Sequence, residues 1–274
     1  MASYKQRVSG KTGLTFSSST TPTEDELSQF LVDGLVDVVN RTIQIDPSLA
    51  MRFSSTTNAT SSVAMTGQII SVMREHDSVS ILRPCTPIPA ELRYEATDPD
   101  SLNFRTKHNP GWYQLEDDIH CVPAASGSGN NDIVVTQIYY DTGLVHGDTT
   151  NPDNFPQEYV YLIVLYACME SCLARISFLE ANLPEEPILA TDIAEIDTQI
   201  DNDDPEMAGI VKEKVGQQIA EHNARLSEYN AEVTKSQLEI KTLTDKYLAF
   251  SNQYNTAFGL SQNIANARAE QEEE

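Results

Sequence analysis

A heptad-spaced stripe of mostly apolar residues runs through the last third of the sequence. From Ile219 to Tyr254 these residues recur in alternating steps of three and four, and no Pro or Gly interrupts them. The spacing predicts one continuous amphipathic helix, because residues three and four apart share a helix face. A helix from Pro205 to Tyr254 would be about 75 Å long at 1.5 Å per residue. No compact domain of this size is that wide, so such a helix must fold back, protrude or pack on neighbours.

Two interpretations of this stripe are open. It could pack within the chain against a shorter apolar stripe at Leu189–Ile200, but that segment covers less than half its length. We therefore favour a contact between subunits, since a one-sided apolar seam this long is not stable alone in water. The residues predicted to form this inter-subunit surface are Leu226, Val233, Ile240, Leu243, Tyr247, Phe250 and Tyr254.

The N-terminal part of the chain has one clear helix signal. Thr23 followed by Glu26 forms a capping box, with acidic residues at the positive end of the helix. A stripe of apolar residues then predicts a helix over residues 23–45, ended by Pro47. Residues 1–22 are polar, rich in Ser and Thr and aperiodic, which is typical of a flexible arm that orders on a partner.

The middle third shows β-type patterns. We interpret the Ser/Thr-rich stretch from Ser54 to Ser62 as a loop, followed by short strand-like runs over residues 66–140. The runs Gln68–Met73 and Val79–Arg83 lie on either side of the polar segment Glu75-His76-Asp77 and predict a hairpin. Together the runs predict one small antiparallel sheet.

A strongly apolar helix is predicted over residues 155–182, with Asn154 as its cap. From Tyr159 to Met169 it is apolar on nearly every face, which is typical of a helix buried in a domain or in a subunit interface. That run is much shorter than the roughly 20 residues that cross a bilayer. We therefore expect no membrane association.

These elements define the predicted architecture. The fold class is mainly α with a small antiparallel β subdomain, a helical bundle core and a long C-terminal amphipathic helix. The predicted parts are a flexible arm (1–22), a core (23–183), a helical extension (184–264) and an acidic tail (265–274).

The charge balance excludes one class of function. The chain has 18 Lys and Arg against 41 Asp and Glu, a formal net charge of −23. Proteins that grip nucleic acid need a basic footprint to displace counterions from phosphate, so tight binding of DNA or RNA is not expected. A polyanion could still pass along such a surface without sticking.

None of the candidate motifs for catalysis or metal binding has all the residues and spacing that it requires. Ser9-Gly10-Lys11-Thr12 lacks the earlier glycine and the preceding strand of a phosphate-binding loop. His120 with His108 or His146 matches no closed zinc pattern. Cys168 and Cys172 lie four apart on an apolar helix, where small core residues are the commoner role than metal ligands. The chain has four cysteines and no Cys-x-x-Cys pair, which favours reduced thiols in the cytoplasm.

We therefore predict a structural protein that is not an enzyme and has no catalytic residues, cofactor or metal. An enzyme with carboxylates dispersed along the chain would leave no such motif and stays an alternative.

Three stretches of the sequence follow one another in a recognisable order. They are the capped helix from Thr23 to Asn40, the Pro-rich stretch from Arg83 to Leu102, and Asn154 to Leu173 with its buried helix. Together they fall within residues 23–182 and resemble the head-to-tail connector proteins of tailed bacteriophages, the adaptor or neck class beneath the portal ring. The smallest adaptors are four-helix units without a long helical C-terminus, and here this chain departs from them.

The resemblance implies a virion protein in the phage neck, made in the host cytoplasm. It implies a dodecameric homo-oligomeric ring around a DNA channel, with the portal protein and other neck or tail proteins as partners. The position within the neck stays open between the first adaptor, a second neck ring and a layer like the tail terminator. The competing interpretation is a soluble coiled-coil scaffold or binding module whose long helix pairs with one helical partner.

Overall fold

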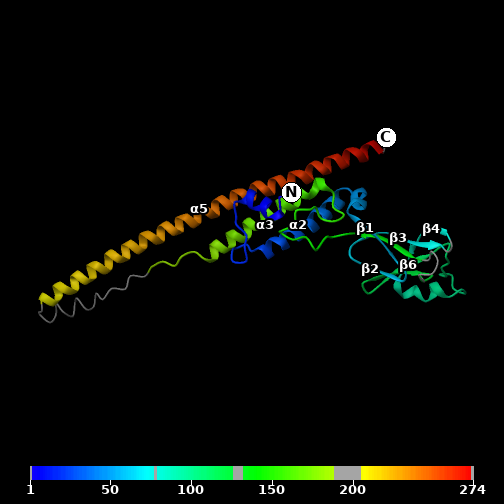
Figure 1. Ribbon diagram of the computed structural model, residues 1–274, viewed down its shortest axis with the longest axis horizontal. Helices are drawn as coiled ribbons and strands as arrows, with labels where there is room; N and C mark the ends of the chain where they lie inside the picture. The colour runs from blue at the N-terminus through cyan, green and yellow to red at the C-terminus, as the bar shows by residue number, and fades with distance from the viewer. Residues whose placement is uncertain (1, 77–78, 126–131, 188–204, 273–274) are drawn as a thin grey trace.

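A computed structural model describes residues 2–76, 79–125, 132–187 and 205–272. Within these ranges the chain forms a helical unit at its centre, a β unit at one end and a long helix that projects at the other end (Figure 1). The α-helices are α1 (Tyr4–Thr12), α2 (Glu24–Ile45), α3 (Val160–Ala181) and α5 (Pro205–Glu272). The strands are β1 (Ser54–Ala59), β2 (Ser62–Ala64), β3 (Ile69–His76), β4 (Val79–Pro84), β5 (Thr86–Pro87), β6 (Gly111–Leu115), β7 (Asp118–Val122) and β8 (Ile133–Ile138). Four 3-10 turns complete the described structure: η1 (Pro47–Phe53), η2 (Ala90–Arg93), η3 (Glu95–Thr97) and η4 (Gln157–Tyr159).

The predicted fold class is wrong. About 53% of the chain is helical and 18% is strand, and the strands form two four-stranded sheets, so the fold is α+β rather than mainly α with a small β subdomain. Strand β1 accounts for part of this error, because it occupies the Ser/Thr-rich stretch that we expected to be a loop. Its pairing with the apolar strand β8, from Ser54 opposite Ile138 to Ala59 opposite Ile133, makes a polar segment into a strand.

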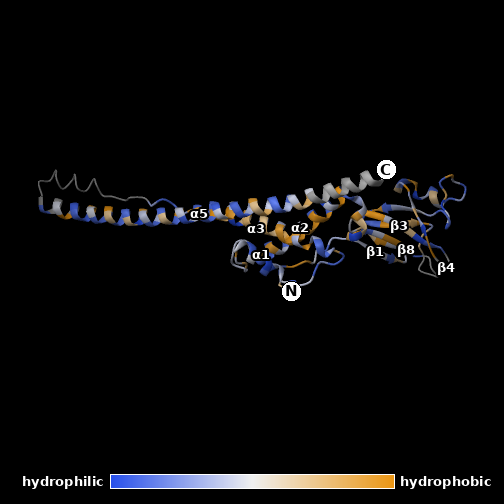
Figure 2. Cartoon of the chain, turned by 90° about the horizontal axis from the view of Figure 1, so that it is seen from above, coloured by the Kyte–Doolittle hydropathy of each residue, from blue (hydrophilic) through white to orange (hydrophobic). Residues whose placement is uncertain are grey.

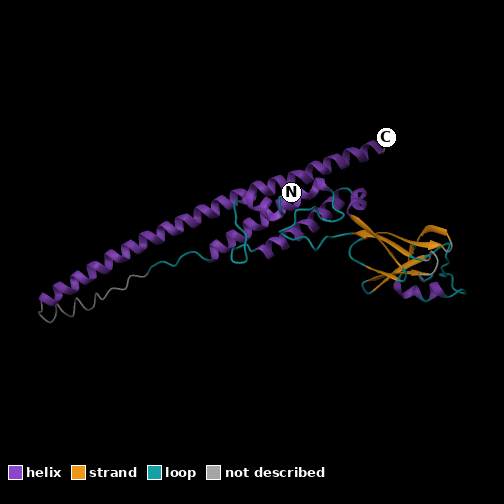
Figure 3. Cartoon of the chain, viewed as in Figure 1, coloured by secondary structure: helices purple, strands orange, loops and turns teal. Residues whose placement is uncertain are grey.

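The β unit is built from these two sheets (Figure 3). Their strand orders are β1-β8-β3-β4 and β2-β7-β6-β5, with every pair antiparallel except β5 with β6. The predicted hairpin is confirmed as β3 and β4. Both sheets contribute to one small core, formed by Val63, Val72, Ile119, Cys121, Ile133 and Val135.

The helical unit has a larger core of its own. The predicted capping box at the start of α2 is confirmed, since Thr23 Oγ1 accepts a hydrogen bond from the Glu26 amide at 3.2 Å. Glu26 Oε2 in turn accepts one from the Thr23 amide at 2.6 Å. At Gly34 the helices α2 and α3 lie so close that an added Cβ would be 3.0 Å from the Tyr166 side chain. A larger residue at this position would therefore require the Tyr166 side chain to shift by a few tenths of an ångström.

The expected flexible arm is wrong, because residues 4–12 are helical and Phe16 is buried. Residues 4–12 form α1, which Ser3 starts with a capping box and which buries Tyr4 and Val8 in the main core. The Tyr4 and Lys5 amides donate hydrogen bonds to the carbonyls of Asp148 and His146. We missed α1 because its apolar stripe has only two members, four residues apart, in an otherwise polar segment.

Helix α3 occupies the centre of the helical unit. It begins at Val160 rather than near Asn154, which adopts a left-handed conformation with φ of 51°. By length and composition, residues Gln157–Ala181 could cross a membrane. In the folded chain, however, α3 packs on α1, α2 and α5, and its first half is largely buried. The apolar character of α3 is therefore explained by its central position. Figure 2 shows the most hydrophobic segments in α2, α3 and the sheets, whereas α5 is more hydrophilic.

An aromatic cluster joins the two units. Phe53, at the end of η1, is fully buried and packs edge-on against Phe155, with ring centroids 5.5 Å apart. The Tyr159 ring lies 5.6 Å from Phe53 on another side. Arg52 and Glu158 form an ion pair at 2.5 Å beside this cluster. The chain thus enters the β unit next to the start of α3, and it leaves at the same place, since the Tyr139 amide donates a hydrogen bond to the Phe53 carbonyl at 2.9 Å.

Candidate interaction surface

The predicted continuous helix is confirmed as α5. It has 68 residues, which corresponds to about 100 Å at 1.5 Å per residue. Its residues from Glu239 to Phe258 hold it to the helical unit, mainly along α3 and also on α2. The stretch Pro205–Leu238 extends past the end of α3, as the views in Figures 1 and 2 both show.

Tyr254 anchors α5 to the helical unit. Its side chain is 1% exposed, and its hydroxyl donates a 2.5 Å hydrogen bond to Asp37 Oδ2 on α2. Asp37 also pairs with Arg41 at 2.9 Å, and the Arg41 guanidinium lies over the Tyr254 ring, 5.3 Å from its centroid. Burial raises the pKa of Tyr254 far above its ordinary value, and the hydrogen bond to Asp37 raises it further. The hydroxyl is therefore a proton donor that holds α5 on α2.

Two further polar contacts fix α5 along its length. Lys246 Nζ donates a 2.6 Å hydrogen bond to the carbonyl of Thr12, the last residue of α1. A cation at this position also complements the negative end of the helix dipole. Arg175 on α3 pairs with Glu239 at 3.0 Å. These contacts tie α5 to α1 and α3.

The structure divides the seven predicted interface residues into two groups. Leu243, Phe250 and Tyr254 are buried in the main core, and Tyr247 packs against it. These four side chains are used within the chain, so they do not form an open surface between subunits. The other three, Leu226, Val233 and Ile240, are half-buried, and for them the inter-subunit role stays a prediction. The alternative partner stripe, Leu189–Ile200, lies outside the described residues.

The heptad spacing alone did not show which partner covers this face of α5. The spacing of apolar residues reports that a helix face is covered, but a neighbouring helix of the same chain covers it as well as another subunit does. Helix α3 is apolar on nearly every face, and it ends almost forty residues before the seam begins at Ile219.

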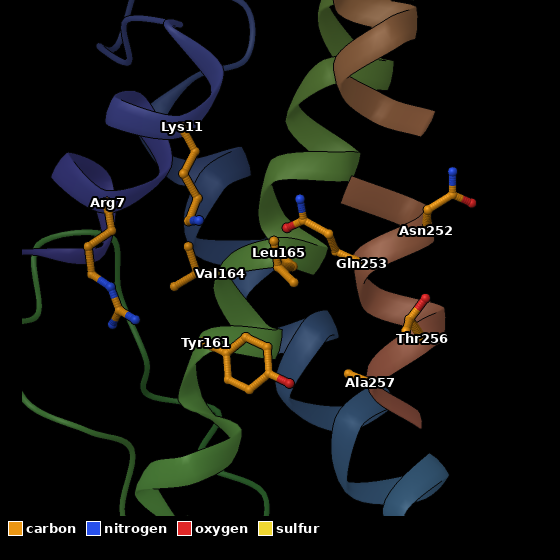
Figure 4. A pocket seen from close by; sticks show the side chains of 9 residues that line it. All are labelled: Arg7, Lys11, Tyr161, Val164, Leu165, Asn252, Gln253, Thr256 and Ala257. Carbon is orange, nitrogen blue, oxygen red and sulfur yellow. The ribbon is translucent and has the colours of Figure 1, made fainter. Parts of the chain in front are cut away.

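A groove lies between three helices on one side of the helical unit. Its volume is about 480 Å³, and it runs between α1, α3 and α5 (Figure 4). Arg7 and Lys11 extend from α1 on one side, while Asn252, Gln253 and Thr256 lie on the α5 side. Apolar residues contributed by α3 and α5 complete the lining, together with one tyrosine: Tyr161, Val164, Leu165 and Ala257.

The charge of this groove is opposite to that of the chain. Arg7 and Lys11 are one helical turn apart, and among the described residues neither forms an ion pair. A second hollow of about 360 Å³ shares Arg7 and Tyr161 with the groove. No acidic residue lines either of them within the part of the chain that the structure describes. A cationic, partly apolar groove on a chain of net charge −23 is a candidate binding site.

Sequence reasoning did not find this groove. Its lining comes from three helices that are far apart in the sequence, and Lys11 was considered only as part of a phosphate-binding loop. In the structure that motif lies inside and at the end of α1, with the Gly13 amide donating to the Ser9 carbonyl. A helix C-terminus presents carbonyls rather than amides, so it does not cradle phosphate.

The described residues offer no metal site. No three His, Cys, Asp or Glu side chains come together as ligands in those parts of the chain. The three histidines that we considered lie apart: His108 contacts His76, His120 stacks on Tyr113, and His146 contacts Ser28. The four cysteines are free thiols.

Burial explains the state of the two helical cysteines. It raises the pKa of Cys168 to about 12 and that of Cys172 to about 11. A thiol held in its protonated form is a poor nucleophile and a poor metal ligand. Both residues therefore behave as small apolar groups in the main core.

Comparison with protein-family models and with curated protein sequences finds no match for this chain.

Proposed function

We propose that this chain is a structural subunit of a tailed-bacteriophage neck, a head-to-tail connector that forms a homo-oligomeric ring around the DNA channel. One observation carries the proposal. Most of the stretch Pro205–Leu238 of α5 projects beyond the end of α3, by roughly 40 Å at 1.5 Å per residue. Neighbouring subunits would cover this stretch in an assembly.

The exposed apolar side chains on this stretch support a role in contacts. Ile210 is 58% exposed and Ile219 is 43% exposed. A helix gains most of its stability from packing rather than from its own hydrogen bonds, so a projecting stretch is best stabilised by a partner. The half-buried residues Leu226 and Val233 lie on the same stretch and offer further contact area.

The β unit supports contact with a second layer. It lies at the opposite end of the molecule from the projecting helix (Figure 1). Its segment between β5 and β6 exposes Tyr94, Leu102 and Phe104. A chain with contact surfaces at both ends is suited to join two rings, such as a portal ring and a tail layer.

The acidic composition supports passage of DNA rather than binding. With a net charge of −23, a ring of these subunits would repel DNA phosphates and let the duplex slide. In this proposal the protein is not an enzyme, and its partners are its own copies, the portal protein and other neck or tail proteins in the virion.

Cross-linking mass spectrometry on native particles tests the proposal. The projecting stretch carries Lys212, Lys214 and Lys235, with Lys241 close behind it. Links from these lysines to a portal-type protein would support the adaptor position and show which way α5 points. Links to tail proteins alone would move the subunit to a lower neck ring or a terminator-like layer. Links to soluble cellular proteins alone would contradict the proposal and favour a coiled-coil scaffold.

A further inference from the structure

The cationic groove between α1, α3 and α5 has no occupant within its own described chain, and its chemistry restricts what could fill it. Arg7 and Lys11 stand on one side of a base formed by Val164, Leu165 and Ala257. An acidic segment with small apolar residues would satisfy both features, because opposite charges pair at the rim while apolar area is buried on the base.

The chain carries a segment of this composition. Ala265 and Ala269 are one helical turn apart, and four of the next five residues are glutamates: Glu270, Glu272, Glu273 and Glu274. This is the most acidic five-residue run of the sequence, and Ala269 directly precedes it. We infer that the groove between α1, α3 and α5 binds the acidic segment Glu270–Glu274 of a second copy of this chain.

The geometry of α5 excludes a contact between the groove and the acidic segment of the same copy. Helix α5 is continuous as far as Glu272. Glu270 therefore lies 13 residues beyond Ala257 on the groove, which is about 20 Å further along the helix axis. A glutamate on a continuous helix does not return to a groove beside the same helix. Figure 1 shows this end of α5 projecting past α3 on the side of the β unit.

The donor and the acceptor are different surfaces of one molecule, so the contact is heterologous. Each copy would offer its acidic segment to one neighbour and its groove to the other, and contacts of this type close into rings when the rotation between copies allows it. The inference rests on the proposed function as a homo-oligomeric ring and supplies one of its contacts. Because Lys11 is exposed and Arg7 half-exposed, the association should weaken as salt is added.

A carbodiimide cross-linking experiment tests the contact directly. This reagent joins lysine to carboxylate without a spacer, so it reports ion pairs. Full-length chain labelled with heavy nitrogen is mixed with unlabelled chain at high concentration and cross-linked. We expect mixed heavy–light peptides that join Lys11 to Glu270, Glu272, Glu273 or Glu274. Lys241, which is exposed on the anchored part of α5, serves as the reference for random links.

Charge reversal then separates this contact from general folding effects. Arg7→Glu with Lys11→Glu should weaken self-association by roughly tenfold or more, as judged by sedimentation at low salt. Adding Glu270→Lys, Glu272→Lys, Glu273→Lys and Glu274→Lys to that variant should restore association, because the pair of charges is exchanged. Lys107→Glu with Lys241→Glu makes the same change in net charge at exposed positions outside both the groove and the stretch Pro205–Leu238, and it should have little effect.

The outcomes distinguish the inference from the proposed function. Self-association that survives the reversal, or links from Lys11 no more frequent than those from Lys241, would overturn the inference and leave the ring proposal standing. An exchanged variant that stays dissociated would also overturn it. A chain that neither associates with itself nor cross-links to neck proteins in particles would overturn both.

Discussion

The Tyr254 hydroxyl donates a 2.5 Å hydrogen bond to the carboxylate of Asp37, which lies 217 residues earlier in the sequence. This contact joins α5 to α2 across the main core, and Arg41 neutralises the same carboxylate from the solvent side. A buried tyrosine that donates to a charged acceptor combines apolar burial with a strong hydrogen bond. The anchored end of the long helix therefore depends on a polar contact that heptad spacing does not specify.

Removing the Tyr254 hydroxyl tests how much it contributes to the free energy of unfolding. Tyr254→Phe keeps the ring and removes the hydrogen bond, while Asp37 retains its pair with Arg41. We expect the free energy of unfolding to fall by about 2 kcal/mol, the usual value for a hydrogen bond to a charged group. Urea denaturation followed by circular dichroism measures the change. Tyr229→Phe, at a half-buried position on the projecting stretch, is the control and should change stability little. Equal effects of the two substitutions would contradict the anchoring role.

The same tyrosine predicts a response to alkaline pH. Burial and the bond to Asp37 raise the pKa of Tyr254, so the folded chain keeps the phenolic proton at pH values where the unfolded chain has lost it. The stabilising contribution is complete below pH 10, the ordinary pKa of tyrosine, and is lost as the pH rises above it. Burial also raises the pKa of Tyr4 and Tyr166, so part of the effect persists without Tyr254. Above pH 10 the stability of the native chain should fall more steeply than that of Tyr254→Phe, and parallel curves would contradict this.

The contact between Lys246 and the end of α1 should stabilise the attachment of α1 to the helical unit. Lys246→Met removes the 2.6 Å bond to the Thr12 carbonyl and keeps the aliphatic part of the side chain. The loss of about 1 kcal/mol should raise the population of chains with α1 detached by roughly fivefold. Cleavage by trypsin after Arg7 and Lys11 should accelerate by a similar factor. Lys241→Met changes an exposed lysine on the same helix and should leave the cleavage rate unchanged.

The elements that the sequence predicted well are those with local signals. Thr23 and Glu26 mark the start of α2 by contacts within one turn, and the absence of Pro and Gly allowed α5 to be continuous. Strand β1 was missed because its polar residues become a strand only through pairing with β8, which lies some eighty residues later. The groove was missed for the same reason, since Arg7, Tyr161 and Thr256 meet only when three distant helices pack together. Local patterns define elements, whereas contacts between distant elements define surfaces.

We expect Arg74 to stabilise the β unit. Its side chain is 3% exposed, and its guanidinium donates hydrogen bonds to the carbonyls of Pro123 at 2.8 Å and Ala124 at 3.2 Å. Arg74→Met keeps the volume and leaves these carbonyls without that donor, which should cost about 3 kcal/mol. Trp112, the single tryptophan, packs against the small core of the β unit, so its fluorescence reports unfolding there.

We expect the Trp112 transition of Arg74→Met to move to a clearly lower urea concentration. Arg93→Met is the matched control, because the polar contacts of Arg93 among the described residues are local, to Ala90 and Tyr94. An unchanged transition for Arg74→Met would mean that the two carbonyls find other donors.

The projecting stretch of α5 provides the sharpest test of assembly. Leu226→Asp with Val233→Asp places two charges on the half-buried face of that stretch, outside the anchored residues from Glu239 to Phe258. We expect at least a tenfold loss of incorporation into particles, because each contact would desolvate a carboxylate without a partner. The helical unit should stay folded, as reported by an unchanged transition in circular dichroism. Leu248→Asp, at a position that is 53% exposed on the anchored part of α5, is the control and should incorporate normally. Normal incorporation of the double variant would mean that the projecting helix is not the contact surface, and the β unit would then be the part of the subunit to probe.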